Sequence, residues 1–309
     1  DLHSFPTRRS SDLIQFGGSI GSWLAKLVHL DETDHHVMIM CGMSAAFAAV
    51  FGTPMAAAVF AMEVVSVGVM YYAALLPCVI ASIIAAEFAT GVGLNPETFP
   101  VARIPQLSLE SGLKMAVIAA GCGLLSILFC VALKAVSGIY GKYLKNPYLR
   151  VCVAGCLVIG ITMLLGTGDY MGAGNELIAK AVEQGKARPL DFLWKMILTA
   201  ITMRAGYRGG EIVPAFSVGA TFGCVAGGLL GFSPEVAAAA SMVALFCGVT
   251  NCPIASMLIS FELFGFSGAA YYLIAISISY ALSGYYSLYK DQTIVYSKYK
   301  ARYINKKTH

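Results

Sequence analysis

A glycine-rich segment in the second half of the sequence has the residue types of an anion site built from backbone. The segment reads Tyr207-Arg208-Gly209-Gly210-Glu211-Ile212-Val213-Pro214 and opens a predicted helix. Adjacent glycines let a backbone approach an ion closely, and the first turn of a helix presents unpaired N–H groups at the positive end of its dipole. Such a helix start can bind an anion without a cationic side chain. The alternative interpretation is a surface helix start that water caps.

Three glutamates in or beside apolar segments are further candidates for chemistry. Glu211 comes directly after the two glycines. It would either face the anion or turn away to pair with Arg204 or Arg208, which lie within one or two helical turns, and both alternatives stay open. Carboxylates inside a membrane are usually functional. Glu63 and Glu262, however, lie at predicted helix ends, where we expect a structural capping role.

The other reactive side chains do not form a catalytic or metal-binding set. All nine cysteines lie in apolar runs without CxxC spacing, which predicts reduced core residues. The five histidines show no metal-ligand spacing, so we expect neither a metal nor another cofactor. His35 and His36 follow acidic residues in a polar connection, which we interpret as a solvated loop. HExxH and paired-aspartate motifs are missing from the sequence, so it does not favour an enzyme.

The segments that surround these candidates are strongly apolar. Of the 309 residues, 58% are hydrophobic and 12% are charged, with a mean hydropathy of +0.72. Soluble domains carry about a quarter charged residues. The composition excludes a water-soluble globule and predicts an integral membrane protein. The net charge of +4 gathers in connections and at the C-terminus, so it does not indicate a nucleic-acid partner.

Apolar runs between polar or Pro/Gly breaks predict an all-α membrane protein. The expected helices are 14–30, 37–50, 54–69, 72–90, 110–137, 150–165, 172–184, 190–203, 212–230, 234–248, 253–266 and 269–288, followed by an amphipathic, basic segment at 293–304. Several are shorter than the roughly 20 residues that cross a bilayer. Short helices favour tilted or re-entrant segments surrounded by protein or by an aqueous pathway. Lone lysines near helix ends, Lys195 among them, are expected to snorkel to the membrane surface.

An internal repeat relates the two parts of the sequence. Residues 51–65 (FGTPMAAAVFAMEVV) resemble residues 250–264 (TNCPIASMLISFELF), and a constant offset aligns a proline and a glutamate in both copies. Upstream, FGGSIG at 16–21 resembles VGATFG at 218–223. Such repeats are typical of transporter folds, in which the ion sites lie at the repeat interface. The alignment leaves open whether the copies are inverted.

The chain divides into three regions of different character. Residues 1–13 are polar and Ser/Arg-rich, and we interpret them as a disordered, non-native or scar segment. Basic residues in the connection 137–150 and at the C-terminus place both in the cytoplasm of a multi-pass cell-membrane protein. The expected division is 1–13, a transmembrane domain at 14–290 with a first repeat at about 14–90 and a second at about 110–290, and a C-terminal amphipathic segment at 291–309.

Taken in order, the motifs resemble the CLC family of voltage-gated chloride channels and anion–proton antiporters. GGEIVPAFSVGATFG at 209–223 resembles the GxFxP signature and the small-residue helix after it. FGTPMAAAVFAMEV at 51–64 is similar to the NAPLAGxxFxxE segment, and NCPIASMLISFEL at 251–263 to its second copy. IQFGGSIG at 14–21 resembles the segment directly after the GxEGP motif, and DQTIVYSK at 291–298 resembles the segment with the anion-binding tyrosine. The resemblance therefore covers Ile14 to the C-terminus.

The resemblance implies a fold, an assembly and a site. The fold would be a CLC-like multi-helix bundle with an inverted repeat, and the assembly a homodimer joined through 54–90 and 253–288. The ligand would be chloride or fluoride, with protons as a coupled partner. The backbone amides of Glu211 and Ile212 would line the central anion site, and the Tyr296 hydroxyl would donate to the anion. The implied anion-binding residues are Gly210, Glu211, Ile212, Pro214 and Tyr296.

Two departures from the family pattern bear on mechanism. Glu63 is followed by Val64 where chloride/proton exchangers commonly carry a second glutamate, so exchange by the usual proton route is not expected. Glu211 stands where most chloride members are apolar, which resembles the fluoride/proton exchangers, because a protonated carboxyl can donate a hydrogen bond to fluoride.

These departures leave three functions to weigh. We expect transport of chloride or another halide. Fluoride/proton antiport with Glu211 as the proton-coupling residue is the alternative, and a non-transporting membrane scaffold is a remote one. The family's GSGIP motif and the gating glutamate of GxEGP would precede Ile14, so the chain as given is not expected to transport alone.

Overall fold

The computed structural model describes residues 12–94, 98–101, 104–207, 209–289, 292–300 and 303–308. The chain forms two compact units. The first comprises Asp1–Pro100, Thr250–Ala269 and Ser287–His309, and the second comprises Val101–Val249 and Ala270–Tyr286. Of the segment 1–13 interpreted as a disordered scar, residues 1–11 lie outside the described part of the chain. Asp12 and Leu13 begin helix α1, so the expected disorder is wrong for these two residues.

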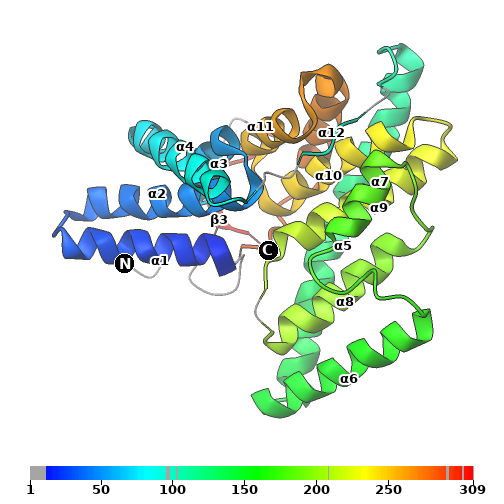
Figure 1. Cartoon of the computed structure of the whole chain (residues 1–309), viewed down its shortest axis with the longest axis horizontal. Helices are drawn as coiled ribbons and strands as arrows, with labels where there is room; N and C mark the ends of the chain where they lie inside the picture. The colour runs from blue at the N-terminus through cyan, green and yellow to red at the C-terminus, as the bar shows by residue number, and fades with distance from the viewer. Residues whose placement is uncertain are drawn as a thin grey trace. The chain divides into compact units, whose positions relative to one another are not determined.

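Each of the twelve expected helices is present (Figure 1). The first unit contains α1 (Asp12–Leu27), α2 (Glu32–Phe51), α3 (Pro54–Glu63), α4 (Leu75–Gly91) and α11 (Pro253–Phe264), with the 3-10 turns η1 (Tyr72–Ala74) and η2 (Phe266–Gly268). The second unit contains α5 (Leu109–Tyr143), α6 (Pro147–Leu165), α7 (Asn175–Glu183), α8 (Asp191–Ala205), α9 (Ile212–Leu229), α10 (Pro234–Thr250) and most of α12 (Ala269–Leu282).

The solvated loop predicted around His35 and His36 is wrong, because these residues lie in the first turns of α2. The helix starts at Glu32, where the side chain of Asp31 accepts a hydrogen bond of 2.8 Å from the amide of Asp34. Acidic residues at a helix start complement the helix dipole and satisfy its free N–H groups. The polar run that suggested a loop is therefore a helix cap.

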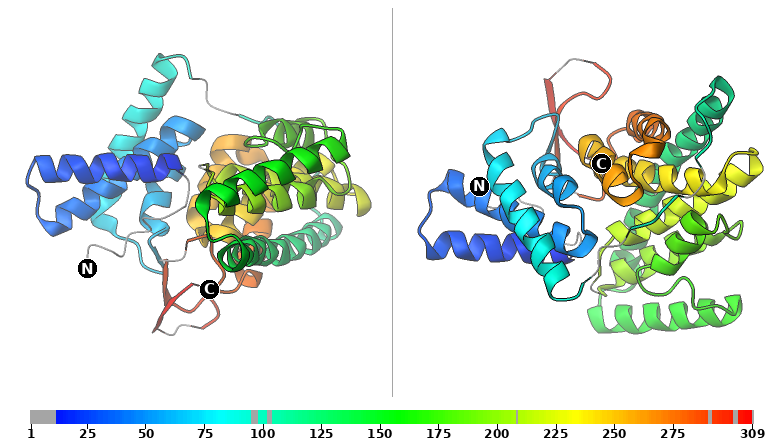
Figure 2. Two further views of the ribbon diagram at one scale, coloured as in Figure 1. Left: turned by 90° about the horizontal axis from the view of Figure 1, so that it is seen from below. Right: turned by 45° about the horizontal axis from the view of Figure 1, so that its top comes forward.

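The C-terminal segment and the end of the predicted helix 54–69 form strands rather than helix. β1 (Ser66–Val67) pairs in parallel with β2 (Thr293–Tyr296), and β2 pairs antiparallel with β3 (Tyr303–Lys307), as Figure 2 shows for the hairpin. β-Branched residues favour extended backbone, and within β2 the side chain of Ile294 is buried while that of Tyr296 is exposed. This small sheet is the only departure from all-helical architecture in the described residues.

In the first unit, α1 and α2 run side by side and antiparallel, in close contact (Figure 1). A Cβ added at Gly17 would collide with the carbonyl oxygen of Gly42, and one added at Gly21 would collide with the carbonyl oxygen of Met38. Only glycine permits backbones to approach this closely. The glycine motif of the first repeat copy therefore makes a helix–helix contact.

In the second unit, α9 and α10 repeat this contact at the matching positions. A Cβ on Gly219 would meet the carbonyl oxygen of Ser241, and one on Gly223 would meet that of Ala237. These positions correspond to those of the first copy by the offsets seen in the sequence. All residues from 236 to 250 are buried, so α10 is the central helix of its unit. The internal repeat is thus a repeat of packing as well as of sequence.

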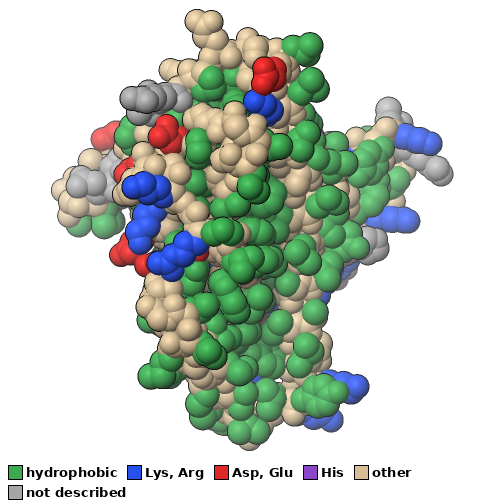
Figure 3. Space-filling model, turned by 90° about the vertical axis from the view of Figure 1, so that its right-hand side faces the viewer, with side chains coloured by type: hydrophobic (Ala, Val, Ile, Leu, Met, Phe, Trp, Pro, Cys, Tyr) green, Lys and Arg blue, Asp and Glu red, His purple; other side chains and the backbone are tan. Residues whose placement is uncertain are grey.

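Five helices are long and apolar enough to cross a membrane by length and composition. They are Glu32–Phe51, Tyr72–Gly91, Leu109–Tyr143, Pro147–Leu165 and Ile212–Leu229. Only 6% of the α6 window is buried inside the protein, and Figure 3 shows a broad hydrophobic face with most charged side chains toward its margins. A surface of this kind requires lipid around it. The remaining apolar helices, α3, α10, α11 and α12 with its preceding turn, are 10–17 residues long, as expected for short or re-entrant segments.

Candidate functional site

The start of α9 has the backbone of an anion site. Gly209 and Gly210 lead without regular structure into Glu211, which is the N-cap, and the helix begins at Ile212. The amides of the first turn have no partner within the helix, and Pro214, at the third helical position, has no N–H. Four of the site candidates therefore lie together in one continuous helix start, at the positive end of the α9 dipole. They are Gly210, Glu211, Ile212 and Pro214.

Glu211 lies against Arg204, which supports one of the two alternatives left open by the sequence. The Nη2 atom of Arg204 lies 3.0 Å from the Oε1 atom of Glu211. The Arg204 side chain is 8% exposed and the Glu211 side chain is 2% exposed. α8 ends at Ala205, and Gly206, with φ +113°, turns the chain so that the end of α8 and the start of α9 meet. Arg208, the other proposed partner, lies outside the described residues. The helix start thus combines backbone donors with a buried, charge-matched carboxylate.

Glu63 and Glu262 form a reciprocal arrangement in the first unit. The carboxylate of Glu63, at the end of α3, accepts hydrogen bonds of 3.1 and 2.9 Å from the amides of Ile254 and Ala255 at the start of α11. The constant offset that aligns the two repeat copies relates each of these residues to a corresponding residue in the other copy.

The second half of the arrangement mirrors the first. The carboxylate of Glu262, at the end of α11, accepts two hydrogen bonds of 2.9 Å from the amides of Met55 and Ala56 at the start of α3. Two helices that cap each other's first turns must run antiparallel about a local two-fold axis. The repeat is therefore inverted, and each glutamate supplies the acceptor that its partner helix lacks.

Tyr296, the expected tyrosine donor, is in the first unit, whereas the start of α9 is in the second. It lies at the end of β2 with 48% of its surface exposed. Its ring meets that of Tyr303 edge-on, with 5.9 Å between ring centroids. The anion site implied by the resemblance draws on both units, so its complete residue set remains a prediction.

Gln292 is a polar residue of the first unit whose role the sequence did not suggest. Its side-chain amide donates to the carbonyl oxygens of Val64 and Thr250 at 2.9 and 2.8 Å. Its side-chain oxygen accepts from Asn251 and Ser287 at 3.0 and 2.8 Å. Gln292 therefore satisfies backbone ends of both repeat copies from a third segment. No periodic pattern marks a residue of this kind, because its partners lie far away in sequence.

Lys195 does not snorkel, contrary to the sequence prediction. Its side chain is 1% exposed, and its ammonium donates to the carbonyl oxygens of Tyr170 and Gly172 at 3.0 and 2.8 Å. Gly172 has a positive φ in the connection that precedes α7, and this turn directs carbonyl groups inward. Hydrogen bonds to these carbonyl oxygens offset part of the cost of burying the ammonium, so Lys195 holds the 166–174 connection against α8.

The same connection and the start of α8 each hold an aspartate with defined partners, Asp169 and Asp191. The Tyr170 hydroxyl donates to Asp191 at 2.6 Å. Burial and the neighbouring Asp191 raise the pKa of Tyr170 to about 12, so it remains a donor. Hydrogen bonding from Thr167, together with Lys180, lowers the pKa of Asp169. Asp169 therefore stays charged at neutral pH. In the described residues, no group of three or more His, Cys, Asp or Glu side chains could hold a metal ion.

Comparison with known proteins agrees with this geometry. The model of the voltage gated chloride channel family matches residues 9–284. A chloride/fluoride channel protein of Pseudomonas syringae pv. tomato is 34% identical over 299 residues, which cover 94% of this chain and 66% of that protein. An H(+)/Cl(-) exchange transporter ClcA of Vibrio cholerae is 25% identical over 272 residues, covering 82% and 58%. The chain thus spans 58–66% of the length of these relatives.

Solved structures show the same fold. The crystal structure of a CLC-type fluoride/proton antiporter superposes with a TM-score of 0.87 and 31% identity, over 92% of this chain and 72% of that one. A slow cyanobacterial Cl-/H+ antiporter gives a TM-score of 0.74 at 19% identity, over 87% and 66%, and supports the fold alone. With its inverted helix pair, its glycine-packed repeat and a family match over most of its length, the chain belongs to the voltage-gated chloride channel family, CLC.

Proposed function

We propose that this chain forms the larger part of a CLC-type transporter that moves a halide ion across a membrane in exchange for protons. The observation that carries the proposal is the buried Glu211 carboxylate at the start of α9, 3.0 Å from Arg204. That helix start offers backbone donors to an anion. Its only described acidic side chain is held there by one arginine, so anion binding and the charge state of Glu211 are linked.

The linkage arises from competition for Arg204. While Glu211 is ionised, its charge is matched by Arg204 and would repel an anion that approaches the α9 amides. A proton on Glu211 removes that repulsion, releases part of the guanidinium, and turns the carboxyl into a hydrogen-bond donor. By linkage, the bound anion favours the protonated form to the same extent. Anion binding and protonation of Glu211 at this helix start are therefore coupled, and exchange requires in addition that the two ions leave it toward opposite sides of the membrane.

Fluoride is the halide that this chemistry favours. Fluoride is the strongest hydrogen-bond acceptor among the halides, and a protonated carboxyl offers it a short, directed donor. The names of two similar proteins, a chloride/fluoride channel protein and a fluoride/proton antiporter, point the same way. Chloride is the second candidate, favoured by the similarity to the H(+)/Cl(-) exchange transporter. Val64 beside Glu63 argues against the usual proton route of those exchangers.

Halide efflux from liposomes that contain the full-length protein tests the proposal, with fluoride, chloride and proton fluxes recorded together. We expect fluoride efflux coupled to proton uptake, and a loss of coupling of about tenfold or more in Glu211→Gln, because a hydrogen bond to a charged group contributes about 1.5–3 kcal/mol and about 1.4 kcal/mol is a factor of ten. Glu110→Gln is the matched control in the same unit, since Glu110 is exposed and forms an ion pair with Lys114 one helical turn away.

Each outcome of the flux assay has a definite meaning. Fluoride selectivity and proton coupling that survive Glu211→Ala would remove the role proposed for Glu211. Chloride flux without fluoride preference would favour the second candidate. An intact, folded full-length protein without any halide flux would leave the membrane scaffold as the explanation.

We further infer a homodimer in the cell membrane with a cytoplasmic C-terminus. Exposed apolar side chains recur every four residues along α4, at Leu76, Ile80, Ile84 and Phe88, with exposures of 69%, 50%, 64% and 72%. This stripe of apolar side chains is suited to packing against a second copy of the chain.

The basic residues in the connection 137–150 and at the C-terminus support the assignment of both to the cytoplasm. If the C-terminus is cytoplasmic, added protease should leave a C-terminal tag uncut in intact cells and cleave it once the membrane has been permeabilised.

A further inference from the structure

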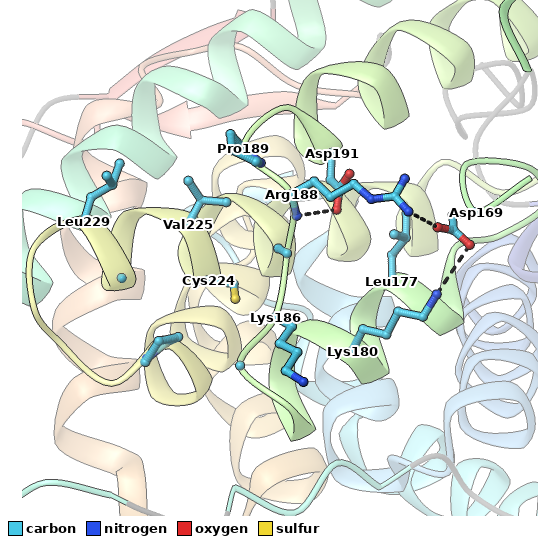
Figure 4. A pocket seen from close by; sticks show the side chains of 14 residues that line it. Asp169, Leu177, Lys180, Lys186, Arg188, Pro189, Asp191, Cys224, Val225 and Leu229 are labelled. Atoms are coloured by element: carbon cyan, nitrogen blue, oxygen red, sulfur yellow. Dashed lines mark hydrogen bonds and ion pairs between the residues drawn. The ribbon is translucent and has the colours of Figure 1, made fainter. Parts of the chain in front are cut away.

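A cavity of about 550 Å³ in the second unit lies between the connection after α7 and the C-terminal half of α9. Cationic side chains of Lys180, Lys186 and Arg188 line one side. Apolar side chains, among them Val225 and Leu229, line another part, and Figure 4 shows these two apart from Asp169, Lys180 and the Arg188 side chain, near which Leu177 lies. The cavity is separate from the start of α9, which is at the opposite end of that helix.

The cations outnumber the lining carboxylates. Asp169 meets Lys180 at 3.4 Å and Arg188 at 3.7 Å. Asp191 accepts hydrogen bonds from the backbone amide of Arg188 at 2.8 Å and from a buried tyrosine hydroxyl, and it keeps its negative charge. No described side chain pairs with Lys186. The lining therefore has three cations, Lys180, Lys186 and Arg188, against two carboxylates, and this excess of one positive charge favours an anion.

The cavity lies at the level where membrane-crossing helices end. α9, a candidate span, finishes at Leu229, which is 82% exposed. α6, another candidate span, finishes at Leu165, which packs in one cluster with Leu177 of the cavity wall. Met163 and Leu164 at that end are 78% and 87% exposed. Because spans end at the boundary between acyl chains and head groups, the cations of the cavity lie at head-group level.

We propose that this cavity binds the phosphate head group of an anionic phospholipid. The guanidinium of Arg188 offers paired N–H donors to phosphate oxygens, and Lys186 supplies a second charge. The acyl chains would follow Leu229 and the apolar wall into the membrane. A free phosphate would make no use of that wall, which is why the amphiphile is the better fit. The site is independent of the proposed transport activity.

Native mass spectrometry of the detergent-purified protein tests this site, with phosphatidylglycerol, phosphatidylcholine and inorganic phosphate as probes. We expect phosphatidylglycerol to bind in preference to phosphatidylcholine, and the double variant Lys186→Gln/Arg188→Gln to weaken its binding at least about tenfold, since each cation near a lipid surface adds to binding. Lys142→Gln/Lys145→Gln removes the same charge at the other end of α5 and α6 and should leave binding unchanged.

Three results would overturn the proposal. They are equal binding of both lipids, unchanged phosphatidylglycerol binding in Lys186→Gln/Arg188→Gln, and inorganic phosphate that competes at the same concentration as the lipid. All four substituted side chains are exposed, so the variants should fold. A melting temperature equal to that of the unsubstituted protein checks this before lipid is added. Because the readout is lipid retention, a failure of halide transport leaves it unaffected.

Discussion

The pair of Arg204 and Glu211 is costly for stability and useful for coupling. Moving two charges out of water costs several kcal/mol per ion, and their attraction offsets this only when the geometry is good. Both side chains are more than 90% buried, at 8% and 2% exposure. A protein that needed only a stable helix start would do as well with a neutral N-cap. The proposed anion, which would enter and leave this helix start, would give the charged pair a function beyond stability.

Arg204→Leu should lower the free energy of unfolding by about 3–5 kcal/mol, because it removes the counter-charge of a buried carboxylate. Adding Glu211→Gln should recover most of this loss, because the double variant has no buried charge at this position. Chemical unfolding in detergent, followed as a double-mutant cycle, measures the coupling. Simple addition of the two single losses would show that the side chains do not act as a pair.

The reciprocal capping of α3 and α11 explains why a glutamate recurs at the end of both repeat copies. Each of these short helices begins at a proline, which has no N–H, and the next two amides have no partner within the helix because they belong to its first turn. The opposite helix supplies a carboxylate to those amides. Two short segments are thereby joined at both ends within the membrane, where an unsatisfied N–H costs several kcal/mol.

Loss of either cap should destabilise the protein by about 1.5–3 kcal/mol, as expected for hydrogen bonds to a charged acceptor. Glu63→Ala should cost more than Glu262→Ala, because Glu63 is buried and Glu262 is only partly buried. Thermal unfolding in detergent measures both. Glu87→Ala, an exposed glutamate on α4, should leave the melting temperature unchanged. A similar fall in that control would mean that the effect is not one of capping.

Replacing a glycine by alanine should change stability in opposite directions on α9 and on α6. Gly223→Ala should destabilise by about 1–3 kcal/mol, because the added methyl meets the backbone of Ala237 in α10. Gly160→Ala on α6 should stabilise by about 0.5–1 kcal/mol, because nothing lies within 4 Å of the added group and alanine is the better helix former. Melting temperatures of the two variants, compared side by side, test the packing. Two changes of the same sign would contradict it.

The two units of the chain do not follow the two repeat copies. The first unit takes Thr250–Ala269 and Ser287–His309 from late in the sequence, so α11 packs with α3 rather than staying with its neighbour α10. Folding of the first unit therefore needs segments separated by some two hundred residues, which makes it a slow step. A truncation before α11 would deprive α3 of its cap.

The α4 stripe makes a prediction about assembly. Ile80→Trp together with Ile84→Trp should shift a dimer toward monomer, because bulky side chains obstruct close packing of helices in lipid. Light scattering of the detergent-purified protein, or subunit counting by photobleaching in liposomes, measures the change. Leu157→Trp on α6, an exposed apolar residue outside the proposed interface, is the control. An unchanged dimer fraction in the α4 variant would exclude this stripe as the interface.

The sequence alone determined the membrane class, twelve helices and the repeat, because those depend on composition, on local apolar runs and on residue order. It also pointed to the helix start at Gly209–Pro214 on the basis of local backbone chemistry. It did not predict the sheet of β1, β2 and β3, or the α2 start at Glu32, where polar residues cap a helix instead of forming a loop.

Three-dimensional packing decided which partner each polar side chain has. Glu63 reaches amides 191 and 192 residues away, and Gln292 reaches a carbonyl 228 residues away. Lys195 is buried against a connection that no periodicity relates to it. Glu211, which the sequence left between an anion and an arginine, lies against Arg204. The strength of a buried polar contact depends on distance and desolvation, and neither is encoded in the spacing of residues along the chain.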